Sequence, residues 1–429
     1  MENHRAVLTA VALAVTIPRL ALFSALGGYL PEPPRDQEIY LRLAGSFLDG
    51  EGLSFSVDEH LYKVSNSRSD DPMAAWTADP DLVFGLGRAG APSALVEPGY
   101  PMLLAAVMSV AGRVSGAVFL VNLIAQLLGA WAMTLLAARL WGGRRGMPAG
   151  LLFALYPYNV FYTANAMTEA VHIAMIPVIL LATVRAMDGR SRSSLPGLAT
   201  GLLFLVRSTA LFILPVQALF LWKARGWRAA AAVVAGFILC AAPWVARNRI
   251  ELGSPILLPT KGSLNLWMRN NPEALALEGI SVPDWVPVNS AELLEYPDDS
   301  RFMTEVERSS ELGRRSLAFM IDNPALMCWL TVERLASFLS AVPSTPSGMA
   351  WIPGALFYVP AACLAGVAFY RSRKSRESAL LLSVFLLYCA MHAMSHGGLR
   401  YRLPVDSILM AAAVSVIPLR GGADGGAAA

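Results

Sequence analysis

Residues 35–53 read RDQEIYLRLAGSFLDGEGL and directly follow the first long apolar segment of the chain. Asp36, Glu38 and Tyr40 fall close together at the start of this stretch, and apolar residues follow them at helical spacing. The pattern predicts an amphipathic helix with two carboxylates at its N-terminal end, where the helix dipole favours negative charge. Spacing alone is also typical of a capped surface helix, so the rest of the chain has to decide between a structural and a functional role.

The composition is that of a polytopic membrane protein. Of the 429 residues, 55% are apolar and 15% are charged, and the mean hydropathy is +0.50. The first segment, residues 6–28, is too long for a signal-peptide core and predicts a retained signal anchor. The further apolar segments are residues 100–111, 116–138, 147–162, 170–186, 195–206, 210–222, 229–245, 325–342, 351–370, 378–394 and 403–419.

The loops between these segments differ in charge, which predicts their side of the membrane. Four short loops, at residues 139–145, 185–192, 223–228 and 371–377, hold thirteen Lys and Arg against two acids. The positive-inside rule places these loops in the cytoplasm. Two long polar stretches are acidic instead: residues 31–97 carry twelve acids and five bases, and residues 248–350 carry thirteen acids and eight bases. Both stretches are therefore expected outside.

Counting crossings then constrains which segments span the bilayer. Segment 100–111 has about twelve residues, fewer than the roughly twenty that a spanning helix needs, so we expect it to lie along the outer interface. The same argument makes 325–342 a lateral helix, and it splits 195–222 into a hairpin that turns at Arg207-Ser208. The prediction is an all-α bundle of about ten transmembrane helices in one domain, residues 1–420. Its outer loops are residues 30–113 and 248–350, both chain ends are cytoplasmic, and residues 421–429 form a disordered tail.

In this topology, polar and ionisable residues gather at the outer ends of the helices, where such residues are costly and are functional candidates by default. Each has an ordinary explanation when taken singly. Arg247 and Arg402 can be snorkelling residues, Glu169 can cap its helix, and Tyr401 can belong to the aromatic belt. Their convergence on one face favours function. Carboxylates in one loop and cations on other helices suit transfer from a phosphate-bearing donor, in which a carboxylate takes the acceptor's proton and the cations neutralise the departing phosphate.

Six short motifs follow one another along residues 1–418. They are Asp36, Tyr40 and Ala44 followed by Gly50-Glu51-Gly52; Pro98-Gly99-Tyr100-Pro101; Pro157 with Thr168-Glu169; Gly197, Gly201 and Arg207; Pro243-Trp244-Val245-Ala246-Arg247-Asn248; and Arg400-Tyr401-Arg402-Leu403-Pro404. The order of these motifs resembles the GT-C superfamily of integral-membrane glycosyltransferases, in the branch of the protein O-mannosyltransferases and the lipid A aminoarabinose transferase (glycosyltransferase family 39-like). One departure is that the family commonly has Asp-Glu in the first loop where this chain has Asp36-Gln37.

The resemblance implies a hexosyl- or pentosyltransferase of the bacterial inner membrane. It would transfer a sugar, with inversion, from a polyprenyl-phosphate donor to a glycan, lipid or protein acceptor on the extracytoplasmic face. Asp36 would be the general base. The substrate-binding residues would be Glu38, Tyr40, Glu169, Arg207, Arg247, Asn248, Lys261, His396, Arg400, Tyr401 and Arg402.

No motif requires a metal or another cofactor, although a divalent cation is compatible with the site, and nothing points to nucleic acid. The alternative function is a non-catalytic transporter or flippase of a lipid-linked sugar, or a membrane scaffold. Transporters often carry internal repeats and bind near the middle of the membrane. This chain shows no repeat, and its polar residues gather on one face, which favours an enzyme.

Overall fold

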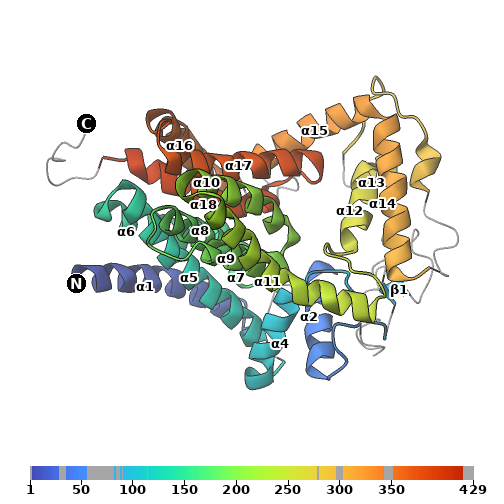
Figure 1. Cartoon of the computed structure of the whole chain (residues 1–429), viewed down its shortest axis with the longest axis horizontal. Helices are drawn as coiled ribbons and strands as arrows, with labels where there is room; N and C mark the ends of the chain where they lie inside the picture. Colours follow the sequence, from blue (N-terminus) through green and yellow to red (C-terminus); the bar gives the residue numbers. More distant parts are fainter. Residues whose placement is uncertain are drawn as a thin grey trace.

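The computed structural model describes residues 2–28, 35–55, 82–83, 87–88, 90–113, 115–277, 280–295, 303–342 and 351–418. These residues form a bundle of helices with a second layer at one end (Figure 1). The predicted tail, residues 421–429, lies outside the described residues.

The bundle is built from helices that coincide closely with the apolar segments. Its elements are α1 (Glu2–Ala25), α5 (Ser115–Trp141), η2 (Gly143–Arg145), α6 (Gly146–Leu155), α7 (Pro157–Thr163), α8 (Glu169–Met187), α9 (Ser194–Val206), η3 (Ser208–Phe212), α10 (Ile213–Arg225), α11 (Trp227–Glu251), η6 (Gly354–Tyr358), α16 (Val359–Arg371), α17 (Arg376–Met394) and α18 (Leu399–Val416). Within the described ranges, six helices are long and apolar enough to cross a membrane: α1, α5, α8, α11, α16 with η6, and α17. The number of crossings stays a prediction.

The second layer comes from the two acidic stretches. The first contributes α2 (Arg35–Leu48), the short antiparallel pair β1 (Leu82–Val83) and β2 (Gly87–Arg88), and α4 (Gly99–Ala111). The second contributes α12 (Lys261–Asn270), α13 (Pro272–Leu277), η4 (Ala291–Leu294), α14 (Glu305–Asp322) and α15 (Pro324–Leu339). Figure 1 shows α4 and α14 running steeply across the direction of α1, whereas α15 leads from α14 back to the bundle beside α17. How α4 and α15 lie relative to a membrane stays a prediction.

Small residues let the bundle helices approach closely. A Cβ added at Gly197 of α9 would lie 1.8 Å from the carbonyl oxygen of Val233 in α11, and one at Gly201 would lie 2.7 Å from Cys240 Cβ. Close backbone approach through small residues is typical of helix pairs in membranes, where van der Waals contact replaces the hydrophobic effect. The predicted hairpin is confirmed: α9 ends at Val206, and Arg207 has an extended backbone (φ −155°, ψ 114°).

The end of the bundle away from the second layer is where the basic loops meet. Asp188 accepts from Arg139 Nη2 at 2.5 Å and from Arg376 Nη2 at 2.8 Å, so one carboxylate joins three loops. Arg145, in the first of these loops, donates to the carbonyl oxygen of Val414 near the end of α18. In the remaining basic loop, Arg225 donates to the carbonyl oxygen of Ala186 at 3.2 Å. The four basic loops therefore share one end of the molecule, as the charge pattern predicts, and their cytoplasmic side stays a prediction.

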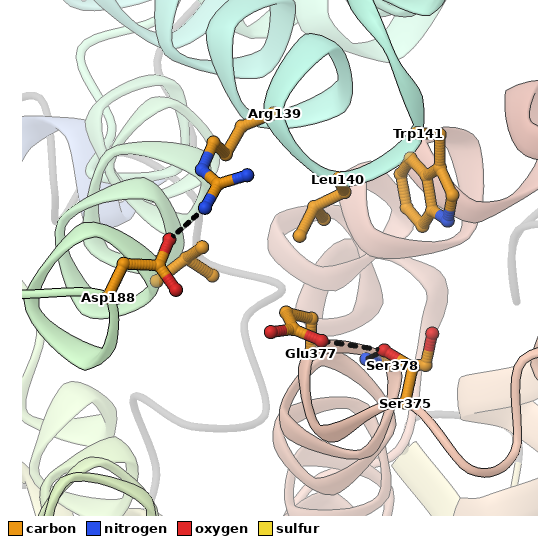
Figure 2. Close-up of a pocket in the computed structure, with 8 residues that line it drawn as sticks. Arg139, Leu140, Trp141, Asp188, Ser375, Glu377 and Ser378 are labelled. Carbon is orange, nitrogen blue, oxygen red and sulfur yellow. Dashed lines mark hydrogen bonds and ion pairs between the residues drawn. The ribbon is translucent and has the colours of Figure 1, made fainter. Parts of the chain in front are cut away.

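A cavity of about 230 Å³ opens among these loops, between the Arg139–Asp188 pair and Ser375, Glu377 and Ser378 (Figure 2). Glu377 accepts from Ser375 Oγ at 2.8 Å and from Arg376 Nε at 2.7 Å. The carboxylates around the cavity are thus already paired. We interpret it as the packed end of the bundle, one full length of α8 away from the outer polar residues.

Candidate functional site

The outer polar residues meet on the carboxylate of Glu169, the first residue of α8. Glu169 is 1% exposed, and its Oε1 accepts from Arg207 Nη1 at 2.8 Å and from Arg400 Nε. Arg207 Nη1 also donates to Thr168 Oγ1 at 2.9 Å. Three separate turns supply these residues: the turn before α8, the hairpin after α9 and the first turn of α18. The predicted convergence of Glu169, Arg207 and Arg400 is therefore confirmed.

Tyr401 forms one wall of this cluster. Arg207 Cζ lies 5.5 Å and Arg400 Cζ 5.8 Å from the centre of the Tyr401 ring, within the range of cation–π attraction. The side chains of Arg207 and Arg400 remain 16% and 30% exposed, while Glu169 lies behind them. The arrangement therefore presents two guanidinium groups outward, oriented by a buried carboxylate and an aromatic face.

The carboxylate of Glu169 pairs with two guanidinium groups at once. Burial alone would lower the pKa of Arg207, but the Glu169 carboxylate outweighs it and keeps this pKa above its ordinary value. Arg207 therefore stays charged, and the guanidinium groups of Arg207 and Arg400 are of the chemical type that binds phosphate oxygens well. In the described part of the chain, Glu169 Oε2 is buried without a hydrogen-bond partner, so it can accept from a ligand hydroxyl.

Helix α2 places the first outer loop against this cluster, as the opening stretch predicts. Gln37 is fully buried; its Oε1 accepts from the backbone N–H of Ala166 at 2.7 Å, and its Nε2 lies 3.4 Å from Asn165 Oδ1. Tyr40, also buried, packs edge-to-face on Tyr100 with ring centres 5.4 Å apart. The backbone of Asp36 lies in the first turn of α2, next to Gln37, and its side chain lies outside the described residues.

A buried polar network supports the turn that carries Glu169. Asn122 Nδ2 of α5 donates to the carbonyl oxygens of Thr163 and Asn165, at 3.2 and 2.8 Å. Arg19 of α1, fully buried, donates to Thr163 Oγ1 at 3.0 Å and to Gln126 Oε1 at 3.2 Å. Buried polar groups that satisfy one another hold a segment in one conformation. The network therefore fixes the 163–168 turn, and through it both Glu169 and the start of α2.

Two arginines predicted as phosphate ligands are occupied in structural contacts. Arg402 is fully buried, with Nε 2.8 Å from Asp406 Oδ1 and Nη1 2.9 Å from the carbonyl oxygen of Phe338. This corrects the prediction for Arg402, because a side chain enclosed in an ion pair cannot reach a donor phosphate. Arg247 donates to the carbonyl oxygens of Ser93 at 2.9 Å and Leu53 at 3.0 Å, so it joins two parts of the first outer loop.

The remaining predicted residues lie around the cluster or away from it. Glu38 accepts from Arg42 at 2.5 Å, one turn along α2. Asn248 is buried and donates to the carbonyl oxygen of Ile256 at 3.0 Å. Lys261 begins α12 and is half-buried. His396 packs against Tyr401 with ring centres 5.3 Å apart.

Sequence reasoning missed two residues at this site. Gln37 counted only as a departure from the expected Asp-Glu pair, although it ties α2 to the turn before Glu169. Arg269 lies in an outer polar stretch but was not predicted as a site residue, and its Nε donates to His396 Nε2 at 2.8 Å. No local pattern marks either residue, since their partners lie more than a hundred residues away. Among the described residues, no group of three or more His, Cys, Asp or Glu is arranged to hold a metal ion.

Comparison with known proteins supports the membrane fold predicted from the sequence. Residues 93–246 match the sequence family described as dolichyl-phosphate-mannose-protein mannosyltransferase. The oligosaccharyltransferase of Archaeoglobus fulgidus in its apo form superposes with a TM-score of 0.56 at 15% identity, over 96% of this chain and 50% of that chain. The chain has the GT-C membrane fold.

Other comparisons add little to the GT-C assignment. The oligosaccharyltransferase AglB from Archaeoglobus fulgidus, solved with an inhibitory peptide and a dolichol-phosphate, gives a TM-score of 0.55 at 14% identity, over 96% of this chain and 50% of that chain. ArnT from Cupriavidus metallidurans is 15% identical over 92% of this chain and 77% of that chain, but its TM-score of 0.36 carries no structural argument. This chain spans about half the length of the oligosaccharyltransferases. No curated protein sequence matches it significantly.

Proposed function

We propose that this chain is a glycosyltransferase that moves a sugar from a polyprenyl-phosphate donor to a hydroxyl group of a glycan, lipid or protein acceptor. The observation that carries the proposal is the cluster in which Glu169 orients Arg207 and Arg400 beside the start of α2. The match to a family named for a dolichyl-phosphate-mannose donor supports it, as does the GT-C fold shared with a protein solved with dolichol-phosphate.

The residues divide the chemistry between binding and proton transfer. Arg207 and Arg400 would bind the donor phosphate and stabilise the charge that develops on it as the glycosidic bond breaks. Glu169 would hold both guanidinium groups in place, and its second oxygen would accept from a sugar hydroxyl. Asp36 would take the proton of the acceptor hydroxyl as the hydroxyl oxygen attacks the anomeric carbon. The electrons of the broken glycosidic bond would leave with the polyprenyl phosphate. Attack opposite the leaving group inverts the anomeric centre.

The site would face the extracytoplasmic side of the bacterial inner membrane. The cluster lies at the end of α8 opposite the basic loops around Asp188, and the positive-inside rule assigns those loops to the cytoplasm. A position at helix ends, beside the second layer, gives an acceptor access from water while the donor tail stays in the bilayer. A transporter site near the middle of the membrane would need its charged groups halfway along the helices.

The test uses purified full-length protein in detergent with a radiolabelled polyprenyl-phosphate sugar. We expect time-dependent release of the sugar onto an acceptor or water. Arg207→Gln together with Arg400→Gln should raise the donor KM at least tenfold, because two charge-assisted contacts are lost. Arg314→Ala is the matched control, since Arg314 is an exposed arginine of α14 that pairs with Glu311. Failure of the wild-type protein to consume any of a panel of donor sugars would favour a transporter or scaffold.

A further inference from the structure

The turn between α17 and α18 is where the second outer loop reaches the cluster. His396 lies in this turn, and its Nε2 accepts from Arg269 Nε at 2.8 Å, in the last turn of α12. An arginine only donates, so this imidazole nitrogen must carry its lone pair. His396 is therefore neutral, with its proton on Nδ1, whenever the contact is made.

A second arginine clamps the same turn. Arg334 of α15 donates to the carbonyl oxygen of Arg269 at 2.6 Å and to Asn270 Oδ1 at 3.1 Å, while its Nη1 lies 3.2 Å from the carbonyl oxygen of Met394. At Gly397 an added Cβ would lie 2.6 Å from Arg334 Cα, so the turn packs directly on the α15 backbone. Helices α12 and α15 and the turn thus form one assembly around His396.

On its other side His396 supports the aromatic wall of the cluster. Its ring meets Tyr401 edge-on at 5.3 Å, and His392 stacks on Tyr401 at 5.2 Å. His392 Nδ1 lies 3.1 Å from the backbone carbonyl oxygen of His396, which ties His392 to the turn. Tyr401 in turn lies under Arg207 and Arg400. A continuous line of contacts therefore runs from α12 through His396 and Tyr401 to the two outward guanidinium groups.

We infer that His396 is a positioning residue: its neutral imidazole latches the second outer loop, through Arg269, to the Tyr401 wall that holds the phosphate-binding arginines. This inference rests on the proposed function, because it assigns the second outer loop a part in binding the donor. In this role His396 acts through Tyr401, whereas the sequence predicts a direct contact with substrate.

The surroundings of His396 keep the latch closed. Among the described residues, the titratable groups that act on His396 are Arg269 from α12, Arg334 from α15, His392 from α17 and Arg207 from the turn after α9, and Tyr401 from α18 packs on its ring. None of these is an acid. Burial first, and then these neighbouring cations, hold the pKa of His396 well below its usual 6.5. The contact therefore persists throughout the neutral pH range and is a fixed structural link.

The experiment compares His396→Ala, His396→Gln and Arg269→Ala in the full-length protein, with Arg314→Ala as control. Glutamine keeps a side-chain oxygen that can accept from Arg269, whereas alanine does not. We expect His396→Ala and Arg269→Ala each to raise the donor KM about tenfold with a much smaller change in kcat, since a lost charge-assisted bond loosens a binding group. His396→Gln should restore most of the donor affinity, and the double alanine variant should be no worse than either single one.

Hydrogen exchange of α12 provides a readout that does not depend on sugar transfer. Amide exchange in residues 261–270 and 395–401 should speed up together in His396→Ala and return towards the wild-type rate in His396→Gln. If wild-type protein transfers no sugar but the exchange result holds, the latch stands and the proposed function fails. The latch itself is overturned if the glutamine variant behaves like alanine, if the two alanine effects add, or if exchange in α12 is unchanged.

Discussion

Glu169→Gln is the substitution that tests the cluster most directly, because both arginines meet on one oxygen of this carboxylate. Glutamine has nearly the same shape and keeps an acceptor oxygen, but it carries no charge. Arg207 and Arg400 would then stand side by side without their shared counter-charge. The expected result is a folded but destabilised protein whose donor binding depends on how far the two guanidinium groups separate.

The size of the effect follows from the contacts. Each hydrogen bond to a charged group contributes about 1.5–3 kcal/mol, and two such bonds end on Glu169. The arginines are 16% and 30% exposed, so water recovers part of the loss, and the neutral amide retains a weaker bond. We therefore expect a destabilisation of about 3 kcal/mol rather than the full sum. Adding polyprenyl phosphate should return part of this stability, since its phosphate supplies the missing negative charge.

Thermal unfolding in detergent measures this prediction, and Glu311→Gln is the matched control. Glu311 also accepts from two arginines, Arg314 and Arg315, but on the exposed face of α14, where ion pairs contribute little. The control should unfold close to the wild-type temperature and should not respond to polyprenyl phosphate. An unchanged unfolding temperature for Glu169→Gln, or an equal drop in both variants, would refute the view that Glu169 organises a buried cationic site.

Three further substitutions probe the groups that position the site, each followed by thermal unfolding. Gln37→Ala leaves a buried backbone N–H without its acceptor, and a loss of about 1–3 kcal/mol is expected; no loss would mean that α2 is held elsewhere. Arg402→Met leaves the buried carboxylate of Asp406 without its counter-charge, although Tyr156 still donates to it, and should destabilise by about 3–5 kcal/mol, whereas adding Asp406→Leu should recover part of it; an additive double variant would argue against the pair. Gly397→Ala forces its Cβ against Arg334 and should destabilise by about 1–3 kcal/mol, and a neutral effect would show that this turn has room.

Local patterns in the sequence predict the helices and much of the cluster. Apolar periodicity and turn residues locate the helix ends, including the break at Arg207, and the basic loops sort those ends into two groups. Once the ends are sorted, Glu169, Arg207, Arg400 and Tyr401 fall on the same side of the bundle, and the structure shows that they also meet there. These features can be predicted because apolar periodicity and loop charge depend only on neighbouring residues and on the membrane.

The roles of individual arginines depend on contacts that local patterns do not contain. Arg247 donates to the carbonyl oxygens of Ser93 and Leu53, which lie 154 and 194 residues away in the sequence. No residue near Arg247 in the sequence predicts these contacts. Arg402 is different, because Asp406 follows four residues later, at the spacing of a helical ion pair. That spacing was a readable signal that Arg402 is a structural residue, although burial of the pair follows only from the packing of α18 against its neighbours, which include Tyr156 and Tyr358.

The central claim, transfer of a sugar from a polyprenyl-phosphate donor with Asp36 as base, is tested most directly by assaying Asp36→Asn and Glu38→Gln side by side with labelled donor. Glu38 is the matched control because it lies in the same helical turn and is already paired with Arg42. Loss of a general base should slow transfer by about 10²–10⁴-fold in Asp36→Asn. Glu38→Gln should stay close to the wild-type rate. Near-normal turnover by Asp36→Asn would contradict the account.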